Sequence, residues 1–355
     1  MPRYLKNSVG IWTFGINPTR FMPGGYHPEY RRESIPDKTK RAIDGLGDLV
    51  DGFEYHYPGE INEENYHQIL KSLGKKDIYC IPLGTFCLPQ YARGGFINPD
   101  KKKRREVIQI CKGAIDLAKK TKSHVIIWPG GEGYNYPFEV DYQKVWTWFI
   151  EGLQECVEHA NKRKVTIFLE HKNSEPKMRI LMRDIGMAIY TIRKIESLGT
   201  DISRLKVNMD WQHLIMNGEN LAEYAALLAM EGLLGHQHGN SGWGLTDDDN
   251  IVGGSFFEQT LGLAKVLQDV GYGKKGERIG FDLFPYTEDQ VEAVKASIIH
   301  WEYFYQLAMK LDSKKLKKAR SRHDALGCYR EIYKNLGVDE KFIKSLKGGI
   351  RKKKW

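Results

Sequence analysis

The chain has 355 residues, of which 41% are hydrophobic and 28% charged, and this excludes a single small module and wholesale disorder. No apolar run approaches the ~18 residues needed to span a membrane, and the first residues lack the apolar core of a signal peptide. The five cysteines (Cys80, Cys87, Cys111, Cys156 and Cys328) are too scattered for a disulfide framework or a thiolate zinc site. They favour reduced thiols and a cytoplasmic protein.

The net charge of +9 is distributed unevenly along the chain. Residues 311–355 contain 15 Lys and Arg against 5 Asp and Glu, so this segment carries +10 and the preceding 310 residues carry −1. We therefore expect a nearly neutral body, residues 1–310, followed by a basic helical C-terminal extension. The extension is expected to pack on another subunit or to face solvent. A patch for an anionic partner is the alternative, and nucleic acid is not the expected partner.

Short apolar runs rich in β-branched residues alternate with longer amphipathic stretches, which predicts repeated strand–helix units. We expect eight strands, at residues 9–14, 51–56, 78–86, 124–128, 165–170, 205–210, 233–238 and 278–283. Helices are expected between and after them, for example at residues 101–121, 142–162, 178–198, 222–231, 256–270 and 288–311.

Eight strands, each followed by a helix, is the count of an α/β (β/α)8 TIM barrel, and about 310 residues suits that fold. The alternative, an open doubly wound sheet, usually has a phosphate-binding glycine turn after an early strand. The segment VGIWTFGINP after the first expected strand is not such a turn. The sequence therefore favours the barrel.

Polar or aromatic residues stand at the ends of the expected strands. They are, in chain order, Trp12, His56, Phe86, Trp128, Glu170, Asp210, His238 and Asp282. In a TIM barrel the carboxyl ends of the strands converge on one mouth, where active sites are built. An unpaired charge on a buried strand is costly, so the four charged or imidazole residues on strands 5 to 8 need a shared partner. A divalent cation is the simplest one.

Three further candidate ligands, His213, Asp247 and Asp249, follow strands 6 and 7. Together the residues suffice for two ions. We assign one ion to the four strand-end ligands Glu170, Asp210, His238 and Asp282. We assign the second ion to His213, Asp247 and Asp249, with Asp210 bridging. Ligands that are mostly oxygen with one imidazole per ion suit Mg, Mn or Co.

Each of these residues also has a purely structural interpretation. Two acids separated by one residue, as Asp247 and Asp249 are, are common in solvated loops. His236 shares a strand face with His238 and is expected to be a packed core histidine. Lys172 shares the strand face of Glu170 and can reach the same substrate oxygen; a surface lysine paired with Glu175 is the alternative. The metal hypothesis rests on the joint placement of the ligands at successive strand ends.

At these residues the chain resembles the xylose isomerase-like barrel family, and especially its two-metal sugar isomerases, over about residues 5–310. The resemblance is carried by an ordered series of motifs: GIWTFG, GTFCLP followed by RGGFINPD, VIIWPGGEGY, LEHKNSEP, VNMDWQH, DDDNIVG and FDLFPYTED. It implies the same division of the ligands, with the site of His213, Asp247 and Asp249 holding the catalytic ion.

The resemblance also implies roles for residues that bind no metal. Lys172 matches a lysine that polarises a substrate oxygen, and His56 matches a histidine that assists opening of the cyclic sugar. Trp12, Phe86 and Trp128 match aromatic walls that shield the reacting carbons from water. A dimer or tetramer is implied as well, with the C-terminal segment wrapping a neighbour.

Three positions depart from the xylose isomerase pattern. Asp210 stands where those enzymes have glutamate, and His238 where they have aspartate; both changes resemble the rhamnose isomerase branch. The aspartate that backs the ring-opening histidine is replaced by Gly59, and Glu60 is the candidate substitute. These departures leave the identity of the sugar open.

The expected function is interconversion of an aldose and a ketose by a metal-assisted hydride shift on a free monosaccharide. A one-metal ketose or polyol-derivative epimerase of the same superfamily is the main alternative. Such epimerases end the eighth strand with glutamate, where this chain has Asp282. Two less favoured alternatives are a metal-dependent nuclease acting on abasic DNA, which the basic tail would serve, and a non-catalytic sugar-binding barrel.

Overall fold

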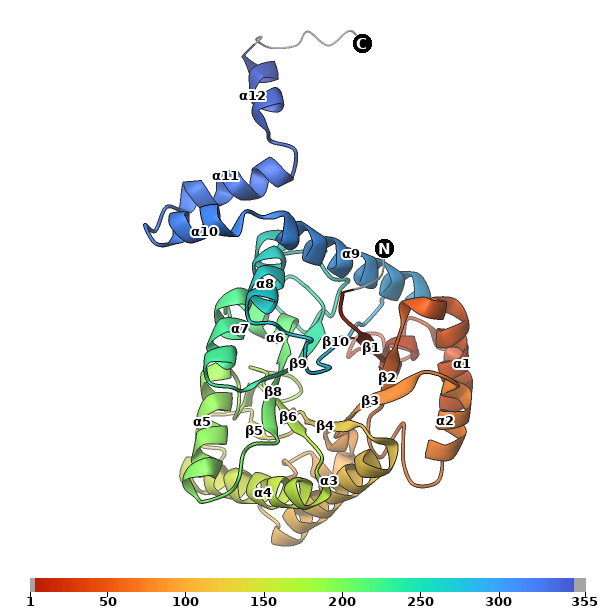
Figure 1. Cartoon of the computed structure of the whole chain (residues 1–355). Helices are drawn as coiled ribbons and strands as arrows, with labels where there is room; N and C mark the ends of the chain where they lie inside the picture. The colour runs from red at the N-terminus through yellow and green to blue at the C-terminus, as the bar shows by residue number, and fades with distance from the viewer. Residues whose placement is uncertain (1–3, 348–355) are drawn as a thin grey trace.

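The computed structural model describes residues 4–347, and it shows a closed parallel barrel surrounded by helices (Figure 1). The barrel strands follow one another around the ring in the order β1-β10-β9-β8-β6-β4-β3-β2. They are β1 (Asn7–Gly10), β2 (Gly52–Glu54), β3 (Asp77–Pro82), β4 (His124–Ile127), β6 (Ile167–Glu170), β8 (Leu205–Asp210), β9 (Leu234–Gly239) and β10 (Ile279–Phe281). The predicted TIM barrel is therefore confirmed.

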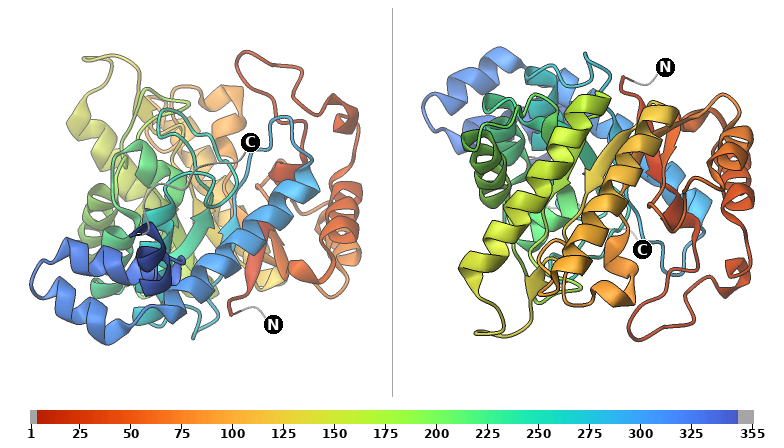
Figure 2. Two further views of the ribbon diagram at one scale, coloured as in Figure 1. Left: turned by 90° about the horizontal axis from the view of Figure 1, so that it is seen from above. Right: turned by 90° about the horizontal axis from the view of Figure 1, so that it is seen from below.

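Helices form the outer layer, and Figure 2 shows them enclosing the barrel in two further views. They are α1 (Ile35–Leu46), α2 (Tyr66–Leu73), α3 (Lys101–Thr121), α4 (Tyr142–Arg163), α5 (Ile185–Ser197), α6 (Trp211–Met216), α7 (Leu221–Met230), α8 (Phe257–Asp269) and α9 (Gln290–Lys310). Several begin at an aspartate N-cap, such as Asp100, Asp141 and Asp289, whose side chain accepts a backbone N–H of the first turn. Their inward faces pack aliphatic side chains against the strands.

Four predicted strands extend too far by two residues or more. Those expected to end at residues 56 and 283 end at Glu54 and Phe281, and two others differ more. The strand expected at residues 9–14 ends at Gly10, and Ile11–Phe14 form a 3₁₀ turn. A Cβ on Gly10 would lie 2.2 Å from the Trp12 ring, so the glycine allows the ring to fold back over the strand end. The strand expected at residues 78–86 ends at Pro82, and the chain turns through Thr85–Cys87.

The helix expected at residues 178–198 begins only at Ile185, after the N-cap Asp184. The residues before it include β7 (Arg179–Ile180), which pairs antiparallel with β5 (Gly133–Tyr134) outside the barrel. This two-stranded sheet joins the loops that follow β4 and β6. The apolar residues before Ile185 have helix-like spacing but belong to a loop, because β7 pairs with β5 where the first helical turns were expected.

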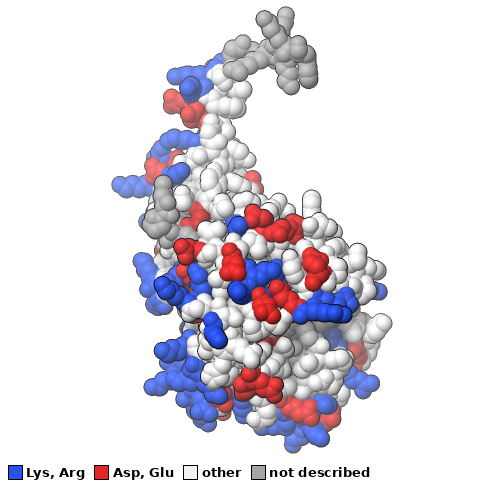
Figure 3. All heavy atoms as spheres, turned by 90° about the vertical axis from the view of Figure 1, so that its right-hand side faces the viewer, with Lys and Arg blue, Asp and Glu red and all other residues white. Residues whose placement is uncertain are grey.

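The C-terminal segment is helical, as predicted, and contains α10 (Ser313–Arg320), α11 (Ala325–Asn335) and α12 (Glu340–Leu346). Figure 1 shows these helices extending away from the barrel beyond α9. α10 buries Leu316 and Ala319, whereas α12 buries none of its side chains. On the face seen in Figure 3, basic and acidic side chains are interspersed over the barrel. Within residues 4–347 no helix is long and apolar enough to cross a membrane.

Candidate active site

A cavity of about 180 Å³ lies at the carboxyl ends of the barrel strands. Ten of the twelve predicted site residues line it: Trp12, His56, Phe86, Trp128, Glu170, His213, His238, Asp247, Asp249 and Asp282. The other two, Lys172 and Asp210, do not line the cavity but contact residues that do. Strand ends distant in sequence thus place the predicted side chains around one space.

His238, on β9, faces three carboxylates. Its Nδ1 atom lies 3.5 Å from Glu170, 3.7 Å from Asp210 and 3.1 Å from Asp282, and makes no hydrogen bond. On the other side of the ring, Nε2 lies 3.2 Å from Glu54, so this nitrogen carries the proton and donates it. Burial opposes the charged form of His238, but Glu170 and the other carboxylates raise its pKa well above the usual value, so Nδ1 holds a proton that a cation would replace. Glu54 orients the ring in the way that a hydrogen-bonded carboxylate orients a metal-binding imidazole.

His213 occupies a second position, in the first turn of α6. Asp210 is the N-cap of this helix, and its Oδ1 accepts the backbone N–H of His213 at 3.0 Å. This cap fixes the imidazole, whose Nε2 lies 3.2 Å from Asp247 and whose Nδ1 lies 3.4 Å from Glu170. The three-residue spacing of aspartate and histidine is therefore both a helix cap and a pair of candidate ligands.

Asp210 is common to two groups of side chains that could each hold a metal ion. One group contains Glu170, Asp210 and His213, and the other contains Asp210, His238 and Asp282. Within each group the candidate ligand atoms all lie within 4.8 Å of one another. The two groups therefore adjoin each other, with Asp210 at their junction.

The loop after β9 brings the two acids of the D-x-D motif to the cavity. Asn240 donates to Asp249 at 2.8 Å and to Asp210 at 3.1 Å, which ties the loop to the strand end. The backbone N–H of Asp247 donates to Glu175, and the Asp247 carboxylate lies 2.5 Å from Lys172 Nζ. Lys172 lies 3.7 Å from Glu175, as the alternative interpretation expected, but it is only 2% exposed and is therefore not a surface lysine.

The pKa shifts follow from this concentration of acids in a buried space. Burial, although partly offset by His238 and His213, raises the pKa of Glu170 to about 7. Burial, followed by repulsion from Asp247 and Asp282, raises the pKa of Asp249 well above its usual range. Burial opposes the charged form of His213, but Asp210 and Asp247 raise its pKa to about 9. All three shifts favour the protonated form, so protons neutralise part of the negative charge of the cluster when no metal cation is bound.

The donor set fits divalent cations. His213 Nδ1, His238 Nδ1 and Asp247 Oδ1 are buried atoms without a hydrogen-bond partner, and leaving such atoms unpaired costs about 1–3 kcal/mol each. With all five carboxylates ionised and both imidazoles neutral, the acids and the Lys172 ammonium carry a net charge of −4, which two divalent cations would neutralise; without cations, bound protons reduce this charge. Oxygen-rich donors with one imidazole per ion suit Mn, Mg or Co.

Aromatic rings form another part of the cavity wall. The ring centroids of Trp12 and His56 are 4.3 Å apart, those of His56 and Phe86 5.6 Å, and those of Phe86 and Trp128 4.2 Å. Trp12 Nε1 donates to Asp282 at 2.6 Å, which joins this wall to the acidic cluster. His56 Nδ1 lies 3.1 Å from Glu60, so Glu60 takes the place of the backing acid that Gly59 cannot supply.

Glu54 was not predicted from the sequence. It is fully buried on β2, and it accepts from Ser8 at 2.6 Å, from His236 at 2.9 Å and from His238 at 3.2 Å. Burial favours its neutral form, but His236 and the hydrogen bonds hold its pKa well below the usual range. His236 packs in the core, where it was expected. Glu54 lies two residues before His56, and this alternation is the signal that could have identified it.

A barrel with a polar cluster and an aromatic wall at the carboxyl ends of its strands has the layout of a TIM-barrel enzyme site. The family model described as xylose isomerase-like TIM barrel matches residues 41–305, and the chain belongs to this family.

Solved structures with the same fold include three epimerases or epimerase-like proteins. An L-ribulose 3-epimerase is 16% identical with a TM-score of 0.63, covering 87% of this chain and 96% of that chain. A D-tagatose 3-epimerase-like protein is 18% identical with a TM-score of 0.64, covering 87% and 100%. A D-allulose 3-epimerase from Methylomonas sp. is 11% identical with a TM-score of 0.61, covering 85% and 99%. At these identities the likeness is one of fold.

Proposed function

We propose that this chain is a divalent-metal-dependent isomerase that interconverts the aldose and ketose forms of a free monosaccharide. The observation that carries the proposal is the position of Asp210 at the junction of two adjoining ligand groups, one with Glu170 and His213 and the other with His238 and Asp282; Asp247 and Asp249 line the same cavity but belong to neither group. One cation would be held by Glu170, Asp210, His238 and Asp282. The second would be held by His213, Asp247 and Asp249, with Asp210 between the two.

When bound, two such cations supply polarisation of both substrate oxygens that exchange a proton in this reaction. The chain contributes the dry surface that hydride transfer needs. Trp12, Phe86 and Trp128 line the same cavity as the acids, so their rings would exclude water from the two reacting carbons. A hydrogen that moves as hydride in such a space does not exchange with solvent.

Lys172 is suited to hold a substrate oxygen. Burial opposes its charge, but Asp247 raises the pKa of the ammonium above its usual value, so it acts as a hydrogen-bond donor and not as a base. Its Nζ lies 5.1 Å from the Trp128 ring centroid, at the edge of the aromatic wall. The lysine therefore stands between the acidic cluster and the surface on which the sugar carbons would lie.

His56 is suited to open the cyclic sugar. Its hydrogen bond to Glu60 places the proton on Nδ1 and leaves Nε2 as a base. The His56 ring packs against Trp12 at a tilt of 48° and against Phe86 edge to face, and these contacts fix its orientation.

A one-metal ketose 3-epimerase is the second candidate, and the fold shared with the three epimerase structures favours it. Such a reaction abstracts a proton between two carboxylates and does not need the ligand set of His213, Asp247 and Asp249. The family resemblance implies a glutamate in such epimerases at the position of Asp282, which here accepts from Trp12 and lies 3.1 Å from His238, and this departure counts against the second candidate.

Two measurements separate these candidates. Equilibrium dialysis with Mn²⁺ should give two ions per chain for the isomerase and one for the epimerase. Incubation of metal-loaded protein with a panel of pentoses and hexoses in deuterated water should give a ketose or aldose product without deuterium. Deuterium at C3 with inversion there would establish the epimerase instead.

We also propose that the enzyme is cytoplasmic and assembles as a homodimer or homotetramer through residues 311–355. Exposed apolar side chains on the C-terminal helices, among them Leu326, Tyr333 and Phe342, support a packing role for this segment. Light scattering of the full chain and of residues 1–310 tests it. A shortened chain with the mass of the full-length oligomer would contradict it.

A further inference from the structure

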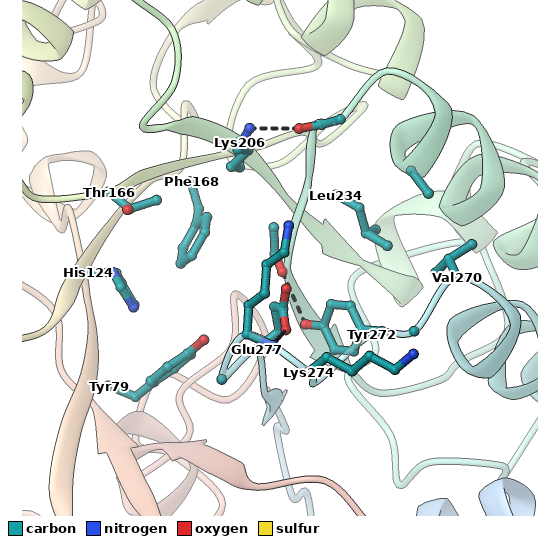
Figure 4. A pocket seen from close by; sticks show the side chains of 16 residues that line it. Tyr79, His124, Thr166, Phe168, Lys206, Leu234, Val270, Tyr272, Lys274 and Glu277 are labelled. Carbon is teal, nitrogen blue, oxygen red and sulfur yellow. Dashed lines mark hydrogen bonds between the residues drawn. The ribbon is translucent and has the colours of Figure 1, made fainter.

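A second cavity, of about 420 Å³, lies at the opposite end of the barrel. It is built at the amino ends of the strands, from residues such as His124, the first of β4, and Leu234, the first of β9. The loop before β10 closes one side with Tyr272 and Glu277 (Figure 4). Because the strands are parallel, this cavity is separated from the candidate active site by the length of the barrel. Its volume is that of a small-molecule pocket.

The cavity is positively charged. Lys206, Lys274 and Lys275 line it, and among residues 4–347 none of the three has a carboxylate within ion-pair distance. Glu277 is the one acid in the lining, and its Oε2 accepts the backbone N–H groups of Gly273 and Lys275 within its own loop. The repulsion is visible at Lys206, where burial and then Lys275 lower the pKa. An anion entering the cavity would relieve it.

One wall of the cavity is a fixed set of aromatic rings. Tyr79 and His124 have centroids 5.2 Å apart, and His124 and Phe168 5.3 Å. Figure 4 shows these rings on one side, with Leu234 and Val270 on the other. The His124 Nδ1 atom is buried in this wall without a hydrogen-bond partner. Burial lowers the pKa of His124 to about 4, so the ring is neutral and can donate to a ligand.

We propose that this cavity binds a small organic anion, whose carboxylate or phosphate group is held by the three lysines and whose apolar body lies against the ring wall. A cationic ligand is disfavoured by the lysines. A fully hydrophilic ion would leave the ring wall and the apolar side chains without a contact. The combination of an uncompensated basic rim and a preformed apolar wall is what selects an amphipathic anion.

The test is a titration of the full chain, saturated with Mg²⁺, with benzoate, phenyl phosphate and the uncharged benzyl alcohol. Both anions should bind, and the tighter one identifies the carboxylate or the phosphate as the preferred group. The double variant Lys206→Gln/Lys275→Gln should weaken binding at least about tenfold. The matched control is Lys71→Gln, at an exposed lysine of α2, which should leave the affinity within about twofold.

A second variant distinguishes a pocket from a basic surface. Ala229→Phe fills the cavity without changing a charge, and it should abolish binding; Val270→Trp fills it from another side if the first variant fails to fold. Unchanged affinity in a folded filled variant would overturn the proposal, as would the absence of anion binding up to about 10 mM. Benzyl alcohol binding as tightly as benzoate would overturn the role of the lysines. None of these outcomes depends on whether the chain is an isomerase.

Discussion

Replacing Glu54 with glutamine should weaken metal binding at the His238 site. The carboxylate accepts a hydrogen bond from His236 and another from His238, and a glutamine amide has only one oxygen to accept both. If the His238 proton moves to Nδ1, it blocks the lone pair that faces Glu170, Asp210 and Asp282. If it stays, the imidazole still loses the negative charge behind it. Either outcome lowers the affinity of His238 for a cation.

The expected magnitude is that of losing a hydrogen-bonded partner of a metal ligand. Such losses typically cost about 10–100-fold in metal affinity, or about 1.4–2.8 kcal/mol. The burial of Glu54, which is 0% exposed, favours the upper part of this range, because no water can replace the carboxylate. Mn²⁺ titration by calorimetry should show one weakened site, while the site of His213 and Asp247 changes little.

Glu132→Gln provides the matched control. Glu132 is also a buried carboxylate, but it accepts the backbone N–H groups of Gly95, Phe96 and Ile97 and touches neither imidazole. This variant should lower the melting temperature and leave the Mn²⁺ affinity unchanged. The reasoning fails if a folded Glu54→Gln protein binds Mn²⁺ as the unaltered chain does, or if Glu132→Gln loses affinity to the same extent.

Three further predictions concern the second ligand group. Asp247→Ala should abolish turnover and leave one ion bound per chain; full activity would refute the second-site assignment. Lys172→Met should lower kcat at least about 100-fold, because it removes a buried hydrogen-bond donor to the substrate. Both ions should be retained, because Lys172 is not a metal ligand. Single-turnover kinetics and equilibrium dialysis measure the two effects. Metal affinity should also depend on pH. The pKa of His213 is raised to about 9, so below pH 9 a cation must displace its proton, and affinity should fall as the pH is lowered. Calorimetry of Mn²⁺ binding at pH 7 in buffers of different ionisation enthalpy should detect the released proton; equal apparent enthalpies would contradict the assignment.

The fold could be predicted because a TIM barrel repeats one local pattern eight times. The errors lay at strand ends, at the start of one helix and in a short two-stranded sheet outside the barrel. Gly10 ends β1 early because Trp12 packs over it, and this contact between neighbours has no periodicity. Pairing between β5 and β7 was equally invisible, since each contributes only two residues.

The candidate site could be predicted because parallel barrel strands bring their carboxyl ends together. Polar residues at several strand ends in one sequence are therefore expected to meet in one place. Glu54 was missed because the strand was expected to end at His56, whereas β2 ends at Glu54, two residues earlier. Lys206, Lys274 and Lys275 were missed as well, since lysines at strand starts and in turns are ordinary surface residues in a sequence. Only the fold shows that the three border one cavity.

The aspartate at position 210 has a structural explanation that the resemblance alone did not supply. Its side chain is the N-cap of α6, a position that favours short polar side chains such as aspartate. The same carboxylate lies 3.7 Å from both His213 and His238, so the residue that starts the helix also stands between the two ligand groups. A glutamate here would reach further into the cavity and would lose the geometry of the cap. One short side chain therefore both starts the helix that carries His213 and adjoins the two ligand groups that would hold the ions.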